Sequence, residues 1–142
     1  MASELSVHAV YQGGMRVLAG SGSHQVLTDY PLPAGAAVEG LTSLELLLAS
    51  LATCAANSVI ALLKRKMNQP VDGLEVYARG MRRDEHPTVL TRIFLEFVVK
   101  GSVDPEAVAK SIAVSEEQLC PVWNMLKSGT PITASFRIAQ NS

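Results

Sequence analysis

The sequence predicts an α+β domain in which antiparallel strands pack around two long helices. Three observations predict this class. Short runs of alternating apolar residues mark strands near both ends of the chain, a long apolar segment follows a helix-start signal, and a second such signal begins at residue 104. At 142 residues the chain has material for one hydrophobic core and little for a second. We therefore expect residues 1–142 to form a single domain.

The first 40 residues predict three strands followed by a loop. Residues 4–20 hold apolar runs on either side of Gly13 and Gly14, which supply the positive φ angles of a tight turn, so this segment predicts a β-hairpin. Residues 23–30 predict a third strand. Residues 31–40 hold two prolines and two glycines without a usable period, which indicates a loop.

A long helix is predicted from Thr42 to about Asn68. Thr42 followed three residues later by Glu45 is a capping-box pattern, and Pro70 prevents the helix from continuing. The basic residues 64–66 suit the negative end of the helix dipole. Because this helix is apolar nearly all round, it needs cover on every face. We expect the second subunit of a homodimer to supply part of that cover.

Two more strands come next. Residues 71–83 and 90–101 are rich in β-branched and aromatic types and flank the turn sequence DEHPT, so they predict two long antiparallel strands. In the second of these, the side chains that share the apolar face are Ile93, Leu95, Phe97 and Val99.

The last third of the chain predicts two helices and a strand. Asp104, Pro105 and Glu106 supply an N-cap, a proline at the first position and an acidic first turn, so a helix is expected from there to about Leu119. Cys120-Pro121 interrupts it, and a short helix through Lys127 follows. Residues 131–139 alternate between apolar and polar types and predict the final strand.

Composition excludes several classes of function. With 48% hydrophobic residues, 18% charged residues and a net charge of -1, the chain is neither a disordered segment nor a basic nucleic-acid binder. The first twelve residues lack the basic and apolar regions of a signal peptide, so we expect a cytoplasmic protein. Stable disulfides are rare in that compartment.

The apolar segment 44–63 is about as long as a membrane span, but its content argues against one. The polar side chains that would need partners in hydrocarbon are Glu45, Ser50, Thr53, Asn57 and Ser58. We therefore expect a helix buried in a soluble protein and no association with a membrane.

Cys54 and Cys120 are the two cysteines of the chain, and they differ in their surroundings. Cys54 lies well inside the predicted long helix, where buried packing is the simplest interpretation and an active thiolate would need a positive partner from elsewhere. Cys120 precedes a proline that suits the start of a short helix, which favours a thiolate. It is equally consistent with a simple helix break, because Glu116 and Glu117 oppose ionisation.

The sequence offers little for other kinds of catalysis. Two cysteines 66 residues apart and three scattered histidines make a poor ligand set, so we expect no metal site and no cofactor. We find no nucleophile elbow of a serine hydrolase and no glycine-rich phosphate loop.

Three segments together resemble the OsmC/Ohr superfamily of thiol-dependent hydroperoxide reductases. They are GGMR at residues 13–16, LTSLELLLASLATC at residues 41–54 and EEQLCPVWNMLK at residues 116–127. The resemblance extends to the order of the predicted elements over nearly the whole chain. It implies an intertwined homodimer with active sites at the subunit interface and with no metal.

The resemblance also implies a role for each site residue. Cys54 would attack an organic hydroperoxide and become a sulfenic acid, and Cys120 would resolve it as a disulfide. A small dithiol or a lipoylated protein would then reduce the disulfide. Arg16 would stabilise the thiolate, although from the residues alone it is a solvated side chain after a hairpin turn.

One departure from the family pattern marks this chain as a more divergent branch. In typical members a glutamate ten residues before the reactive cysteine holds the arginine, but that position here is Leu44, and the nearest acid is Glu45. Glu45 is therefore a candidate replacement, although its capping-box role explains it equally well. The alternative function is a non-catalytic protein that binds a small ligand or senses redox state.

Overall fold

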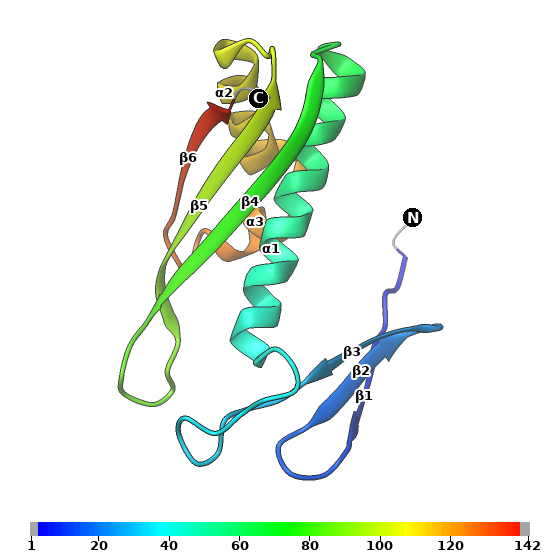
Figure 1. Cartoon of the computed structure of the whole chain (residues 1–142), viewed down its shortest axis with the longest axis vertical. Helices are drawn as coiled ribbons and strands as arrows, with labels where there is room; N and C mark the ends of the chain where they lie inside the picture. The colour runs from blue at the N-terminus through cyan, green and yellow to red at the C-terminus, as the bar shows by residue number, and fades with distance from the viewer. Residues whose placement is uncertain (1–2, 140–142) are drawn as a thin grey trace. The chain divides into compact units, whose positions relative to one another are not determined.

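The structure is a computed structural model and describes residues 3–139 (Figure 1). It divides into two compact units, the first ending at Leu47 and the second beginning at Leu48.

The first unit holds a three-stranded antiparallel sheet in the order β1-β2-β3. Its strands are β1 (His8–Tyr11), β2 (Val17–Ser21) and β3 (His24–Thr28). The predicted hairpin and third strand are therefore confirmed. After β3 the chain forms the expected loop and returns beside the sheet, where the N–H of Asp29 donates to the carbonyl of Leu41 at 3.0 Å.

The long helix begins where the sequence predicts. Helix α1 spans Ser43–Ile60, and the N–H of Thr42 donates to Glu45 Oε1 at 2.8 Å while the N–H of Glu45 donates to Thr42 Oγ1 at 3.2 Å. This is the reciprocal capping box, which satisfies two N–H groups that the first turn leaves free. The last six residues, Ala61–Lys66, widen into a π-helix, η1, which the sequence did not predict.

The second unit holds the other three-stranded sheet, in the order β4-β5-β6. Its strands are β4 (Val71–Arg82), β5 (Leu90–Gly101) and β6 (Ile132–Ala139). Strands β4 and β5 are antiparallel as expected, but β6 runs parallel to β5. The reason is the connection, because a chain that crosses over through helices returns in the same direction.

Three helical segments form this crossover. They are α2 (Pro105–Val114), the π-helix η2 (Ser115–Leu119) and the short helix α3 (Pro121–Leu126). Asp104 caps α2 by accepting from the N–H of Glu106 at 3.1 Å, which confirms the predicted start. Cys120 separates η2 from α3, so the predicted break is also confirmed.

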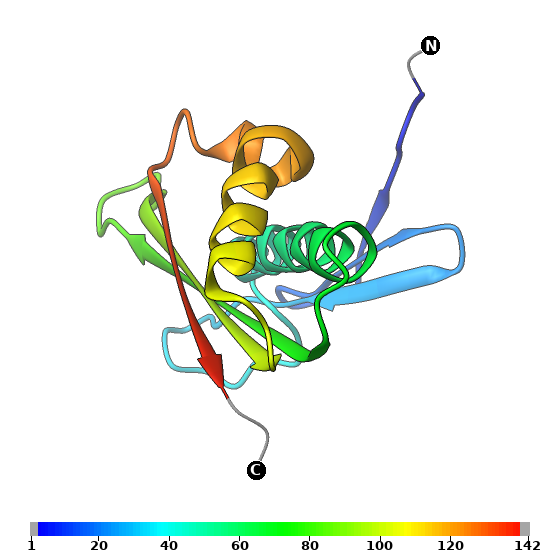
Figure 2. The ribbon, with the colours of Figure 1, turned by 90° about the horizontal axis from the view of Figure 1, so that it is seen from above.

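The core of the second unit lies between its sheet and its helices, which cover the same face of the sheet (Figure 2). The apolar face predicted for residues 90–101 is buried there, with Phe97 fully enclosed. The ring of Trp123, also fully buried, stacks on Phe97 with the ring centroids 6.2 Å apart. This packing fixes the segment that carries Cys120 against the sheet.

Helix α1 is less covered than its composition requires. Its buried residues are Leu51, Ala55 and Val59, on a helix of 18 residues. Residues Ser43–Lys66 are long and apolar enough to cross a membrane by length and composition alone. A single helix of this kind is weak support for a membrane span, because the core helix of a soluble protein meets the same criterion.

Candidate redox site

The structure brings Cys54 and Cys120 together. Cys54 projects from α1 and Cys120 from the break between η2 and α3, and their side chains hydrogen-bond to each other. Both thiols are free. The packing of the second unit thus makes neighbours of two residues that lie far apart in the sequence.

The local backbone explains how Cys120 reaches this position. The N–H of Cys120 donates to the carbonyl of Ser115 at 2.8 Å, which closes the last wide turn of η2. The Cys120 backbone is then extended, and the N–H of Asn124 donates to its carbonyl at 3.0 Å as α3 begins. Because two helical segments meet at this residue with different directions, the Cys120 side chain enters the core and is 1% exposed.

Burial decides the ionisation of Cys120. Desolvation raises its pKa to about 11, and the hydrogen bond with Cys54 acts in the same direction. The N–H groups of Trp123 and Val122 lower the pKa, as the start of a short helix predicts, but burial outweighs them. Cys120 is therefore a protonated thiol at neutral pH, and the predicted thiolate at this position is not favoured.

Cys54 is the more accessible of the two sulfurs. Its side chain is half-buried and packs against the edge of the core, whereas Cys120 is enclosed. One turn later, the Ser58 hydroxyl donates to the Cys54 carbonyl at 3.1 Å. The hydroxyl hydrogen of Ser58 is therefore used by the backbone and not by the Cys54 sulfur. Of the two cysteines, Cys54 therefore leaves more of its surface open to solvent.

The raised pKa of Cys120 predicts a loss of stability at alkaline pH. The folded state keeps the Cys120 proton up to about pH 11, whereas the unfolded chain releases it near the ordinary value of 9.0. The contribution to the free energy of unfolding is therefore complete below about pH 9. It declines by about 3 kcal/mol as the pH rises through this window.

Urea unfolding of the reduced protein at several pH values measures this effect. Cys120→Ala is the control, because it lacks this thiol and keeps every other titratable group of the chain. The difference in unfolding free energy between the two proteins should shrink as the pH rises. Parallel profiles would contradict the expected contribution of Cys120.

Arg16 belongs to the first unit and is held by the turn between β1 and β2. Gly13 and Gly14 have φ angles of 95° and 62°, which glycine adopts without strain, and the N–H of Arg16 donates to the Gly13 carbonyl at 3.0 Å. The guanidinium lies back over this turn, since a Cβ built on Gly14 would stand 3.7 Å from Arg16 Nη1. The turn sequence therefore shapes the position of the arginine.

Two acids from the loop after β3 lie near Arg16, and the sequence did not single out either. Arg16 Nε is 3.9 Å from Glu39 Oε2. Asp29 is nearly buried and accepts from the N–H groups of Tyr30 at 2.7 Å and Glu39 at 3.0 Å. The Glu39 and Tyr30 N–H groups lower the pKa of Asp29, and Arg16 adds a smaller effect in the same direction.

The same unit contains a cavity beside the arginine. It has a volume of about 300 Å³ and is lined by apolar side chains together with Arg16 and Asp29. The apolar contributors include Met15, Leu32 and Ala36. Glu45, by contrast, is engaged with Thr42 at the start of α1, so the acids that the structure gives to Arg16 are Glu39 and Asp29.

Within residues 3–139, no group of three His, Cys, Asp or Glu side chains is arranged to hold a metal ion.

Comparison with known proteins agrees with this arrangement of elements. The profile of the family described as OsmC-like protein matches residues 35–135. Protein YhfA of Escherichia coli K12 is 32% identical over 127 residues, which cover 88% of this chain and 91% of YhfA. These two matches identify the family from sequence.

Solved structures show the same fold at lower identity. A hypothetical protein from Aquifex aeolicus superposes with a TM-score of 0.87 at 24% identity, covering 99% of this chain and 100% of that one. The organic hydroperoxide resistance protein OhrB of Bacillus subtilis superposes with a TM-score of 0.64 at 20% identity, covering 93% of this chain and 96% of OhrB. With its mixed α and β architecture and its match to the family profile, this chain belongs to the OsmC-like family.

Proposed function

We propose that this protein is a cysteine-based peroxidase that reduces organic hydroperoxides. The observation that carries the proposal is the contact between two free thiols, one half-buried and one enclosed. A peroxidase that forms an internal disulfide needs such a pair, because the second thiol must reach the first one after oxidation. The relation to the OsmC-like family, some of whose structural relatives are named for resistance to organic hydroperoxides, supports this function.

In the proposed cycle, the Cys54 thiolate attacks one peroxide oxygen. The sulfur bonds to the terminal peroxide oxygen with its hydrogen, the O–O bond breaks, and Cys54 becomes a sulfenic acid. The alkoxide leaves as the alcohol after taking from solvent the proton that the Cys54 thiol released when it ionised. The Cys120 sulfur then attacks the Cys54 sulfur, and the hydroxyl leaves as water with the proton of the Cys120 thiol. A dithiol reduces the resulting disulfide by exchange and becomes a disulfide itself, which restores both cysteines.

The surroundings of the two cysteines support this division of roles. Cys54 is the more exposed of the two residues, whereas Cys120 is enclosed and holds its proton at neutral pH. A buried, protonated thiol is a poor first nucleophile, because the thiolate is the reactive form. In the second step Cys120 must give up this proton as it attacks, and the proton leaves with the hydroxyl of the sulfenic acid as water.

We further propose that Arg16 stabilises the Cys54 thiolate. The ion pair with Glu39 and the nearby carboxylate of Asp29 favour an orientation of this guanidinium toward the loop after β3. In this proposal Glu45 holds the start of α1 and has no part in the chemistry. The cavity beside Arg16 is lined by both polar and apolar groups, and its apolar side chains, Met15, Leu32 and Ala36, support an organic hydroperoxide as the substrate.

The reductant that we propose is a small dithiol or a lipoylated protein. A dithiol forms an intramolecular disulfide after the first exchange step, which drives release of the reduced enzyme. A series of monothiols and dithiols at equal thiol concentration would test this, with turnover expected only from the dithiols.

We propose that the working form is a homodimer. The support is α1, a mostly apolar helix of 18 residues of which only Leu51, Ala55 and Val59 are fully buried within one chain. Sedimentation equilibrium should therefore give about twice the monomer mass of 15.1 kDa. A mass of one chain at micromolar concentration would contradict this prediction.

The test of the proposed chemistry is the intact mass of the reduced protein before and after one equivalent of cumene hydroperoxide. A disulfide removes two hydrogens and both titratable thiols, and a dithiol should reverse the change. Catalytic consumption of peroxide should then follow when dithiol is in excess. An unchanged mass with both thiols still titratable would overturn the proposal, and slow, sub-stoichiometric consumption would favour a ligand-binding or redox-sensing protein.

A further inference from the structure

The break at Cys120 leaves two backbone carbonyls without their ordinary helical partners. In an α-helix the carbonyl of Glu117 would accept from the N–H of residue 121, and in a π-helix the carbonyl of Glu116 would do so. Residue 121 is proline, which has no N–H. Both carbonyls are therefore open to a donor from another part of the chain or from water.

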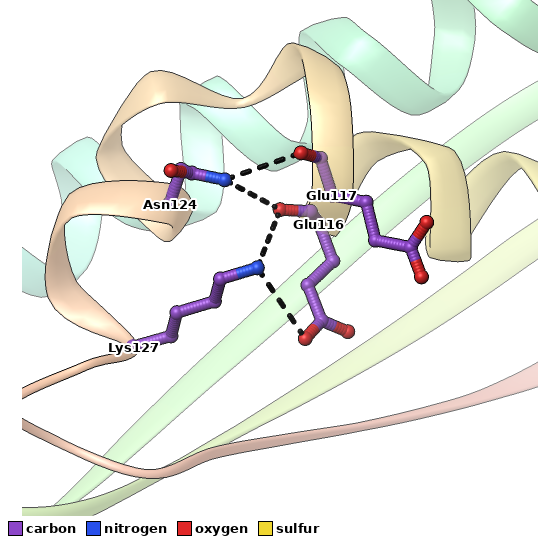
Figure 3. A network of polar contacts seen from close by, with 4 residues as sticks. All are labelled: Glu116, Glu117, Asn124 and Lys127. Carbon is purple, nitrogen blue, oxygen red and sulfur yellow. Dashed lines mark hydrogen bonds and ion pairs between the residues drawn. The ribbon is translucent and has the colours of Figure 1, made fainter.

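Two side chains of the segment after the break supply these donors (Figure 3). Asn124 Nδ2 donates to the carbonyls of both Glu116 and Glu117, each at 3.3 Å. Lys127 Nζ donates to the Glu116 carbonyl at 3.3 Å and lies 3.9 Å from Glu116 Oε2. These contacts join the end of η2 to α3 and its last turn, and we call them the carbonyl clamp.

The carbonyl clamp spans the residue that the proposed resolving step depends on. Cys120 lies between the two joined segments, and its side chain is the one that reaches Cys54. A disulfide requires defined separations and torsion angles, so a small rotation of either segment would carry the Cys120 sulfur away from its partner. Side chains that fix the angle between η2 and α3 therefore fix the direction of this thiol.

We propose that Asn124, assisted by Lys127, is a positioning residue that holds the Cys120 thiol against Cys54 for disulfide formation. This inference rests on the proposed function for its role in catalysis. The geometric part stands apart from peroxide chemistry, because the ease with which the two sulfurs pair can be measured with a dithiol buffer alone.

The first measurement is the equilibrium of the Cys54–Cys120 disulfide in buffers of reduced and oxidised dithiothreitol, read by alkylation and intact mass. Asn124→Ala should lower the equilibrium constant for disulfide formation about fivefold, the size expected from one or two exposed hydrogen bonds. Asn124→Asp keeps the shape of the side chain but loses the donor, and it should cause a similar fall. Lys127→Met should cause a smaller one.

The second measurement separates the two chemical steps in a single turnover with cumene hydroperoxide. Asn124→Ala should form the sulfenic acid at Cys54 at the wild-type rate and should convert it to the disulfide about fivefold more slowly. Dimedone trapping of the sulfenic acid should increase accordingly. A general loss of structure would slow both steps.

Two control variants isolate the effect. Glu117→Gln changes the same turn but keeps its carbonyl, and the Glu117 side chain points away from Asn124 and Lys127 (Figure 3). Val98→Ala should lower the stability of the fold without touching the site. Val98 is buried, with 2% of its surface exposed, and lies outside the core cluster that includes Cys120. Both controls should keep the wild-type disulfide equilibrium.

The outcomes distinguish the two proposals. A wild-type equilibrium and a wild-type second step in Asn124→Ala and Lys127→Met would overturn the positioning role. An equal shift in Val98→Ala at a matched melting temperature would also overturn it, since the effect would then be general destabilisation. A shift in Asn124→Ala in a protein that does not react with peroxide would overturn the proposed function and uphold the carbonyl clamp.

Discussion

Cys54→Ser is expected to abolish peroxide turnover, with a loss of at least about 10³-fold in kcat/KM for cumene hydroperoxide. The serine hydroxyl stays protonated at neutral pH and cannot replace a thiolate as the nucleophile that breaks the O–O bond. Because Cys54 is half-buried at the edge of the core, the substitution should leave the fold intact. Coupled consumption of a dithiol with hydroperoxide measures the loss.

Cys120→Ser is the matched variant, since it removes the other sulfur and keeps Cys54. It should still consume one equivalent of hydroperoxide and accumulate a sulfenic acid at Cys54, which dimedone would trap. Full turnover in Cys54→Ser would contradict the assignment of Cys54 as the attacking residue. A sulfenic acid at Cys120 in that variant would reverse the two roles.

Local signals explain why most elements could be predicted from the sequence. Gly13-Gly14 marks the first hairpin, and Thr42 with Glu45 marks the start of α1, because each of these patterns satisfies its backbone requirements within a few residues. The same holds for Asp104 at the start of α2. Such signals need no knowledge of the remainder of the chain.

The features that the sequence did not predict depend on distant contacts or on small changes of backbone geometry. The π-helices η1 and η2 differ from an α-helix by one residue per turn, and nothing in their side chains marks the change. The parallel pairing of β6 depends on how the crossover packs, although the helices between β5 and β6 could have indicated it. Neither feature alters the expected class of fold.

For the candidate site, the residues could be predicted from the sequence but their contacts could not. Cys54 and Cys120 could be selected from their sequence contexts, but their contact depends on the packing of α1 against the segment around Trp123, which no spacing rule supplies. The acids beside Arg16 could not be predicted, because they come from the loop after β3, whose path no local pattern of residues determines. The cytoplasmic location and the lack of nucleic-acid and membrane partners stay predictions.

Substitution of Arg16 should have the second-largest effect. Arg16→Met is expected to lower kcat/KM for the hydroperoxide about 100-fold, the size typical of losing one charged group that stabilises a reacting anion. Arg16→Lys should recover only part of this loss, because an ammonium group lacks the planar fork that two acids can orient. The rate of Cys54 alkylation by iodoacetamide as a function of pH would report the same effect on the thiolate.

Glu39 and Glu45 provide a matched pair of substitutions that test the role of Arg16. Both lie in the first unit, but only Glu39 pairs with Arg16. Glu39→Gln should lower kcat/KM in the same direction as Arg16→Met but by less, since the ion pair is largely exposed and Asp29 stays near the guanidinium. Glu45→Gln preserves the capping box, in which glutamine serves as well as glutamate, and should therefore retain wild-type activity. If Glu45→Gln were the more damaging change, the thiolate would depend on Glu45, and the assignment of Glu39 as the acid that orients Arg16 would be wrong.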